Sequence, residues 1–206
     1  MKKFGVILLA ALALLSVTGC SETAGNGGTQ ETTAAAAEKS AGGIEVTTGD
    51  GFDEEYSPVL KAYFEAIEKQ DFDAYKASIY PPFYEKLEAF YKQQDKTMED
   101  VFAGLHRQFD EDGYESWTFT RMYLTYYANS QGVSSENDAL DFLAAFQTNG
   151  IVDEAFVEDT KKAARDMQDV KFTVYALYNG DEEDVAVLSG KEILTIKTEA
   201  GTYLFG

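Results

Sequence analysis

The chain has 206 residues and carries 36 Asp and Glu against 17 Lys and Arg, which gives a formal net charge of −19. Phosphate backbones and anionic lipid surfaces repel such a chain, so its charge argues against nucleic-acid binding and direct docking on an anionic membrane face. We expect an acidic surface that mainly confers solubility, with cations or a basic protein as the alternative partners.

The first 20 residues combine a basic start, a short apolar run and a cysteine. Two lysines precede the apolar stretch 6–15, and Val17-Thr18-Gly19-Cys20 follows it, with Cys20 as the only cysteine of the chain. The apolar stretch is too short to cross a hydrocarbon core of about 30 Å as a helix. A cleaved leader is therefore favoured over a transmembrane anchor, and these features resemble the signal of bacterial lipoproteins.

This resemblance implies that the Cys20 sulfur receives a diacylglyceryl group and that the signal peptide, residues 1–19, is removed. Two acyl chains anchor a protein stably, whereas one chain binds only marginally. The implied location is extracytoplasmic, on the cell membrane and lipid-anchored; the alternative is an ordinary secretory signal with a chance cysteine. Without Lys2 and Lys3 the chain keeps 15 basic and 36 acidic residues, a net charge near −21.

Residues 20–53 are rich in Gly, Thr, Ala, Glu and Ser and contain few large apolar side chains. Such a segment buries too little surface to offset the entropy lost on ordering. We predict a flexible tether with a root-mean-square reach of roughly 30 Å. A single domain over residues 54–206 follows, of a common size and large enough to bury its own core.

The first half of this domain shows helical periodicity. Apolar residues recur from Tyr56 to Ile67 at the spacing of one helix face, which predicts a helix there. The starts of later helices are marked by residues that cap or begin a first turn, at Asp71, Pro81-Pro82, Thr97, Ser135 and Asp153.

Over residues 115–127 the helical spacing of apolar residues gives way to alternating positions, which predicts a long strand there. One face of this strand is expected to carry Trp117, Phe119, Arg121 and Tyr123. Further strands are predicted at 170–178, 185–188, 193–198 and 202–205, with turns at Asn179-Gly180 and Ala200-Gly201. The order of elements predicts an α+β fold, with helices packed on one face of a curved antiparallel sheet.

The segment from Tyr63 to Tyr75 resembles the opening of NTF2-like, cystatin-like domains. In that family one helix ends in a short polar turn with an acid before an aromatic residue, as in Gln70-Asp71-Phe72, and a second helix begins. The resemblance implies a cone with a pocket over residues 54–206. Domains of this kind often pair through the open face of the sheet, so a homodimer is one implied state.

Arg121 is the candidate centre of such a pocket, together with Trp117, Phe119 and Tyr123. If this strand face lines the cone, a guanidinium among aromatic rings can hold a carboxylate or another anion. If the face points outward, Arg121 is a solvated charge with its stem lying on neighbouring rings. Both alternatives stay open on the sequence alone.

Catalytic and metal chemistry have little support in the sequence. His106 is the only histidine, which excludes a metal site built on several histidines, and we expect it to be structural or at the surface. The acidic segment from Asp110 does not fit a calcium-binding EF-hand loop, because its glycine falls at position four instead of six. We predict no catalytic residue and no cofactor.

The leading hypothesis is a non-enzymatic, membrane-anchored lipoprotein whose domain binds a ligand or a protein partner. One alternative is an NTF2-like enzyme of the isomerase, dehydratase or hydrolase type, which requires a buried carboxylate with a raised pKa facing a cavity. The other is a structural module in envelope or cell-wall assembly, which resembles the non-catalytic NTF2-like domains of some cell-wall synthesis proteins.

Overall fold

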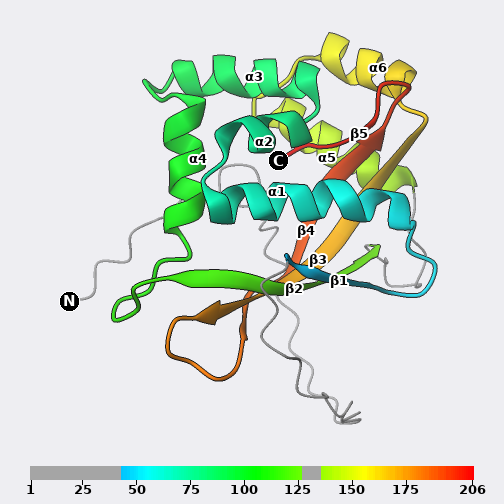
Figure 1. Cartoon of the computed structure of the whole chain (residues 1–206). Coiled ribbons are helices and arrows are strands. Elements are labelled where there is room, and N and C mark those ends of the chain that lie inside the picture. The colour runs from blue at the N-terminus through cyan, green and yellow to red at the C-terminus, as the bar shows by residue number, and fades with distance from the viewer. Residues whose placement is uncertain (1–42, 127–135) are drawn as a thin grey trace, which may run out of the picture.

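The computed structural model describes residues 43–126 and 136–206 and shows an α+β fold (Figure 1). Its elements in chain order are β1 (Glu45–Thr48), a short 3-10 helix η1 (Glu54–Tyr56), α1 (Ser57–Lys69), α2 (Phe72–Ser78), α3 (Pro81–Lys92), α4 (Met98–Arg107), β2 (Trp117–Tyr126), α5 (Glu136–Thr148), α6 (Glu154–Ala163), β3 (Asp166–Tyr178), β4 (Val185–Lys197) and β5 (Thr202–Leu204).

The strands form one curved sheet in the order β1-β2-β3-β4-β5, and α1 lies across one side of it (Figure 1). We call the side toward α1 the inner face and the opposite side the outer face. The pairs β2–β3, β3–β4 and β4–β5 are antiparallel, whereas β1 runs parallel to β2. The sheet is therefore mixed, and the prediction of a purely antiparallel sheet is wrong at this edge.

The predicted helix starts are confirmed wherever the structure describes them. The side chains of Asp71, Thr97 and Asp153 accept hydrogen bonds from backbone N–H groups in the first turns of α2, α4 and α6. Pro81 occupies the first position of α3, where its missing N–H costs nothing. The cap predicted at Ser135 lies outside the described residues.

The ordered domain begins before residue 54, so the predicted end of the tether is wrong. β1 lies within the segment expected to be flexible, and Ile44 and Phe52 on either side of it are buried. Parallel pairing needs a long crossover connection, which helices α1–α4 supply between β1 and β2. Because β1 has four residues and a single large apolar side chain, Val46, its sequence carries almost no strand signal.

The two strands predicted at 185–188 and 193–198 are one strand, β4, interrupted by irregular pairing. Its register with β3 shifts between Phe172 and Val174 and again between Val174 and Tyr175. Gly190 has a φ of +58° in this region, a conformation that glycine adopts without steric cost. The irregular stretch explains why the sequence pattern breaks there although the strand continues.

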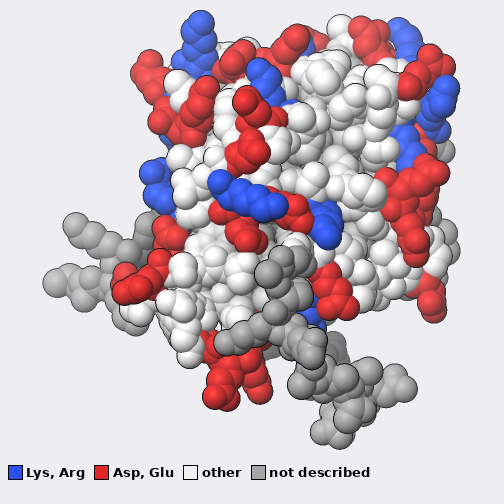
Figure 2. All heavy atoms as spheres, in the orientation of Figure 1, with Lys and Arg blue, Asp and Glu red and all other residues white. Residues whose placement is uncertain are grey.

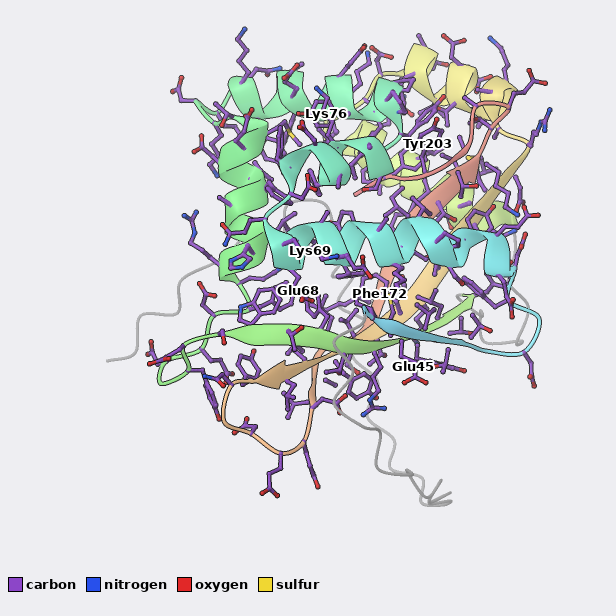
Figure 3. All side chains as sticks on the ribbon, viewed as in Figure 1. Glu45, Glu68, Lys69, Lys76, Phe172 and Tyr203 are labelled. Atoms are coloured by element: carbon purple, nitrogen blue, oxygen red, sulfur yellow. The ribbon has the colours of Figure 1, made fainter. Side chains whose placement is uncertain are left out.

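The core lies between α1 and the inner face of the sheet. Phe64 of α1 contacts Phe119 of β2 and Phe172 of β3, with ring centroids 5.7 and 5.3 Å apart. Figure 3 shows Phe172 in this position, between α1 and the strands. A second aromatic group joins α3, α5, α6 and the C-terminal segment, and consists of Phe83, Phe146, Phe156 and Phe205.

Candidate functional site

A β-bulge in β2 decides where the candidate pocket residues lie. Phe119 pairs with Ala176 and Arg121 pairs with Tyr175, so Thr120 is an extra residue with no counterpart in β3. One extra residue reverses the alternation of the side chains beyond it. Phe119 therefore lies on the inner face, and Arg121 on the outer face.

The expectation that the four candidate residues share one strand face is wrong for this reason. Trp117 and Phe119 lie together on the inner face, with their ring centroids 4.8 Å apart, and Phe119 is buried. Tyr123 follows Arg121 on the outer face and is exposed. The structure does not bring the aromatic pair and the arginine into one site.

Arg121 forms a bidentate ion pair with Asp184 on the outer face. Its Nε and Nη2 atoms each donate to a carboxylate oxygen of Asp184 at 2.9 Å, and its guanidinium lies 3.7 Å from the ring centroid of Tyr175. The hydrogen bonds to Asp184 raise the pKa of Arg121, and the same bonds lower the pKa of Asp184. The Arg121 side chain is 49% exposed. This placement matches the outward alternative, and an anion would have to displace Asp184 to reach the guanidinium.

The inner face beneath α1 is occupied by aromatic side chains. Phe64 of α1 packs there on Phe119 and Phe172, whereas Tyr63 of α1 and Tyr75 of α2 are buried between the helices, with ring centroids 5.5 Å apart. Burial raises the pKa of both phenols, so they stay protonated at neutral pH. These hydroxyl groups are not prepared to act as bases at neutral pH.

A polar cluster that the sequence did not reveal lies at the start of α1. The hydroxyl of Tyr56, which is fully buried, donates to Asp166 at 2.5 Å. The ammonium of Lys197 lies 4.5 Å from the centroid of the Tyr56 ring. It also pairs with Asp53 and, at 2.8 Å, with Glu55. These contacts hold the segment entering α1 against the ends of β3 and β4.

Tyr56, Asp53 and Lys197 of this cluster keep their ordinary protonation states at neutral pH. Burial, followed by the hydrogen bond to Asp166, raises the pKa of Tyr56. Partial burial of Lys197 opposes its charge, but the hydrogen bonds to Asp53 and Glu55 outweigh it and raise its pKa. The bond from Lys197 lowers the pKa of Asp53. Because none of these shifts moves a group toward neutral pH, the cluster acts as a structural clamp.

Asp169 of β3 is buried, and it is the kind of group that the enzymatic alternative requires. It lies opposite the buried Leu194 of β4 in the register of the sheet. Sequence reasoning did not single out Asp169, because β3 also carries Asp166, Gln168 and Lys171, so one more polar residue in this strand gives no distinct signal.

His106 packs at the surface near the start of β2. Its ring centroid is 4.9 Å from that of Trp117, and its Nε2 atom is 3.4 Å from the side-chain nitrogen of Gln70. The indole N–H of Trp117 donates to Asp110 at 3.1 Å. The histidine and the tryptophan thus close the end of the inner face between α4 and β2.

Three of the surface grooves are lined entirely by described residues. One of about 480 Å³ lies between the end of α4 and the start of β4, and one of about 500 Å³ lies beside α6 and the start of β3. A third, of about 550 Å³, lies between the start of α3, the end of α6 and the β4–β5 turn. None of the three is lined by Arg121, Trp117, Phe119, Tyr123 or Asp169.

Within residues 43–126 and 136–206, no group of three or more His, Cys, Asp and Glu side chains is arranged to hold a metal ion. No helix in that part of the chain is long and apolar enough to cross a membrane. Residues 1–42, with the predicted signal and lipid attachment at Cys20, lie outside the described part. A comparison of the chain with protein-family models, curated proteins and solved structures finds no match.

Proposed function

We propose that this chain is an extracytoplasmic lipoprotein, anchored through lipidated Cys20, whose domain binds a protein partner and catalyses no reaction itself. The observation that carries the proposal is the position of Arg121 on the outer face, paired with Asp184, while aromatic rings occupy the inner face. This arrangement favours recognition by the surface over chemistry in an interior pocket.

The proposed fold family is the NTF2-like cone. Support comes from the curved sheet with α1 lying across it and from the helix–turn–helix opening with its Asp71 cap (Figure 1). In this interpretation the cone has lost its pocket to aromatic packing, as in a module that serves assembly instead of catalysis. A role in envelope or cell-wall assembly is one form that partner binding could take.

The anchoring proposal is tested with the full chain carrying Cys20→Ser, expressed in a bacterial host and labelled with an alkyne analogue of palmitate. We expect the unmodified chain to incorporate the label and sediment with membranes, and the variant to lose both properties. Ser21→Ala is the matched control and should behave like the unmodified chain. Equal labelling or equal membrane recovery of the Cys20→Ser variant would contradict lipid attachment at Cys20.

Partner binding is tested by chemical crosslinking of intact cells that produce the full chain. We expect a product of one defined mass, larger than the chain, whose second component is a different protein identified by mass spectrometry. A product of twice the chain mass would indicate a homodimer instead. A chain that stays free at every crosslinker concentration would contradict the proposal, as would reproducible substrate turnover by the purified protein.

A further inference from the structure

We propose that the groove between the end of α4 and the start of β4 binds an extended, basic segment of the partner protein, which lies alongside β4. This inference rests on the proposed function and deepens it by naming the site and the chemistry of the partner. We call this site the β4 groove. Its lining residues are Gln108, Phe109, Glu111, Tyr178, Val185, Ala186, Val187, Leu188 and Lys191.

One edge of β4 is open along this groove. β5 pairs with β4 only from Thr195 to Lys197, at the far end of the strand. Among the described residues, no strand pairs with that edge of β4 between Val185 and Lys191. Such an edge presents backbone N–H and C=O groups that an extended peptide can pair with. The register shifts in this part of β4 twist the edge, so they favour a short added segment over a long strand.

The floor of the β4 groove is apolar. Phe109, Tyr178 and Leu188 are buried beneath it, and Val185 at its border is 48% exposed. The ring of Tyr114 packs on that of Tyr178 at a centroid distance of 4.9 Å. An extended segment places every second side chain on one side, so its alternate apolar residues can cover this floor.

The borders of the β4 groove are strongly acidic. The turn before β2, residues 110–115, and the turn before β4, residues 181–184, together contain eight acidic residues and no basic one, and one of the eight, Asp184, is paired with Arg121. Figure 2 shows acidic side chains gathered at the two places where Figure 1 draws these turns. The hydroxyl of Tyr114 donates to Asp181 at 3.3 Å and so joins the two turns. The last turn of α4 also lies here; it carries the negative end of the helix dipole and the positive side chain of Arg107.

Charge complementarity selects the occupant. The lining of the groove contains one acid, Glu111, and one base, Lys191, so the negative charge that favours a basic segment comes from the two acidic turns at its borders. A second copy of the anchored chain, without residues 1–19, would bring another net charge near −21 to this surface. Residues 21–42 of the chain itself contain three glutamates and one lysine, so they too are poorly matched. A basic segment from another protein is the best match.

The test uses the full chain in detergent and two fluorescein-labelled peptides, one alternating lysine with valine and the other alternating glutamate with valine. Fluorescence anisotropy should show binding of the lysine peptide, and at least about tenfold weaker binding of the glutamate peptide. Glu182→Gln/Glu183→Gln should weaken binding of the lysine peptide about threefold to tenfold. The matched control is Glu85→Gln/Glu88→Gln, which removes the same charge from an exposed face of α3 and should leave the affinity unchanged.

Val185→Lys tests the apolar border directly, because Val185 is exposed and its replacement leaves the core intact. It should weaken binding of the lysine peptide at least about tenfold. Equal effects of the two glutamine pairs, or unchanged binding by Val185→Lys, would overturn the inference. The inference would also be overturned if the unmodified chain formed an oligomer and Val185→Lys dissociated it, because the occupant of the groove would then be a second copy of the chain.

The outcomes separate this inference from the proposed function. If intact cells give a crosslinked partner and the purified chain binds neither peptide, the assignment of the β4 groove as the binding site is wrong, and the proposal of partner binding stands. If the lysine peptide binds as expected and no partner is crosslinked in cells, the groove stands as a peptide site and the proposed function is contradicted.

Discussion

Truncating Phe119 and Arg121 to alanine tests the bulge that separates these two residues. Phe119 is buried, with ring centroids 5.7 Å from Phe64 and 5.0 Å from Phe109. Removing such a ring loses its transfer free energy and leaves a cavity, so Phe119→Ala should lower the free energy of unfolding by about 3–5 kcal/mol. Within the whole stability of a domain, a loss of that size is large.

Arg121→Ala should lower the free energy of unfolding much less than Phe119→Ala does. The Arg121 side chain is 49% exposed, so water screens its ion pair with Asp184. Exposed pairs contribute about 0.2–1 kcal/mol, and an exposed cation–π contact such as that with Tyr175 adds about 0.5–1 kcal/mol. The expected loss in the free energy of unfolding is therefore about 0.7–2 kcal/mol, well below that of Phe119→Ala.

The assay is urea unfolding of the full chain carrying Cys20→Ser, followed by tryptophan fluorescence and by circular dichroism. Both probes should give the same midpoint, and the slopes should match among the variants, so that midpoint differences report stability. Arg165→Ala is the matched control, because Arg165 forms an exposed ion pair with Glu199 at 3.0 Å. Equal losses for Phe119→Ala and Arg121→Ala, or a larger loss for the arginine, would refute opposite placement of the two side chains.

Two further predictions concern hydrogen bonds to carboxylates. Tyr56→Phe keeps the ring under Lys197 but removes the donor to Asp166, so it should lower the free energy of unfolding by about 1.5–3 kcal/mol. A loss below about 0.5 kcal/mol in urea unfolding would contradict the clamp. The hydrogen bonds from Arg121 lower the pKa of Asp184 below its ordinary value of 3.8. The contribution of this ion pair to stability is therefore fully present above pH 3.8 and is lost as the pH falls through the lowered pKa. The stability difference between the unmodified chain and Asp184→Asn should therefore shrink from neutral pH to about pH 2.5, and a constant difference in thermal unfolding would count against the pairing.

Features that depend on neighbouring residues were predictable from the sequence. The helix caps at Asp71, Thr97 and Asp153 need only a side-chain oxygen three residues before the backbone N–H from which it accepts a hydrogen bond. The α+β class followed from the change of apolar period between α4 and β2. The lipoprotein signal, which ends at Cys20, is local in the same sense and stays a prediction.

The features that decide the candidate site depend on pairing between distant residues, and the tertiary structure alone decided them. The bulge at Thr120 exists only in the register of β2 against β3. The alternation of the sequence therefore predicted Phe119 and Arg121 on the same face, although they lie on opposite faces of the sheet. β1 is a strand because β2, more than 70 residues later, offers its edge. The pairing of Tyr56 with Asp166 likewise joins residues 110 positions apart. Local patterns carry the period of a strand, but its register and partners are set by packing across the whole chain.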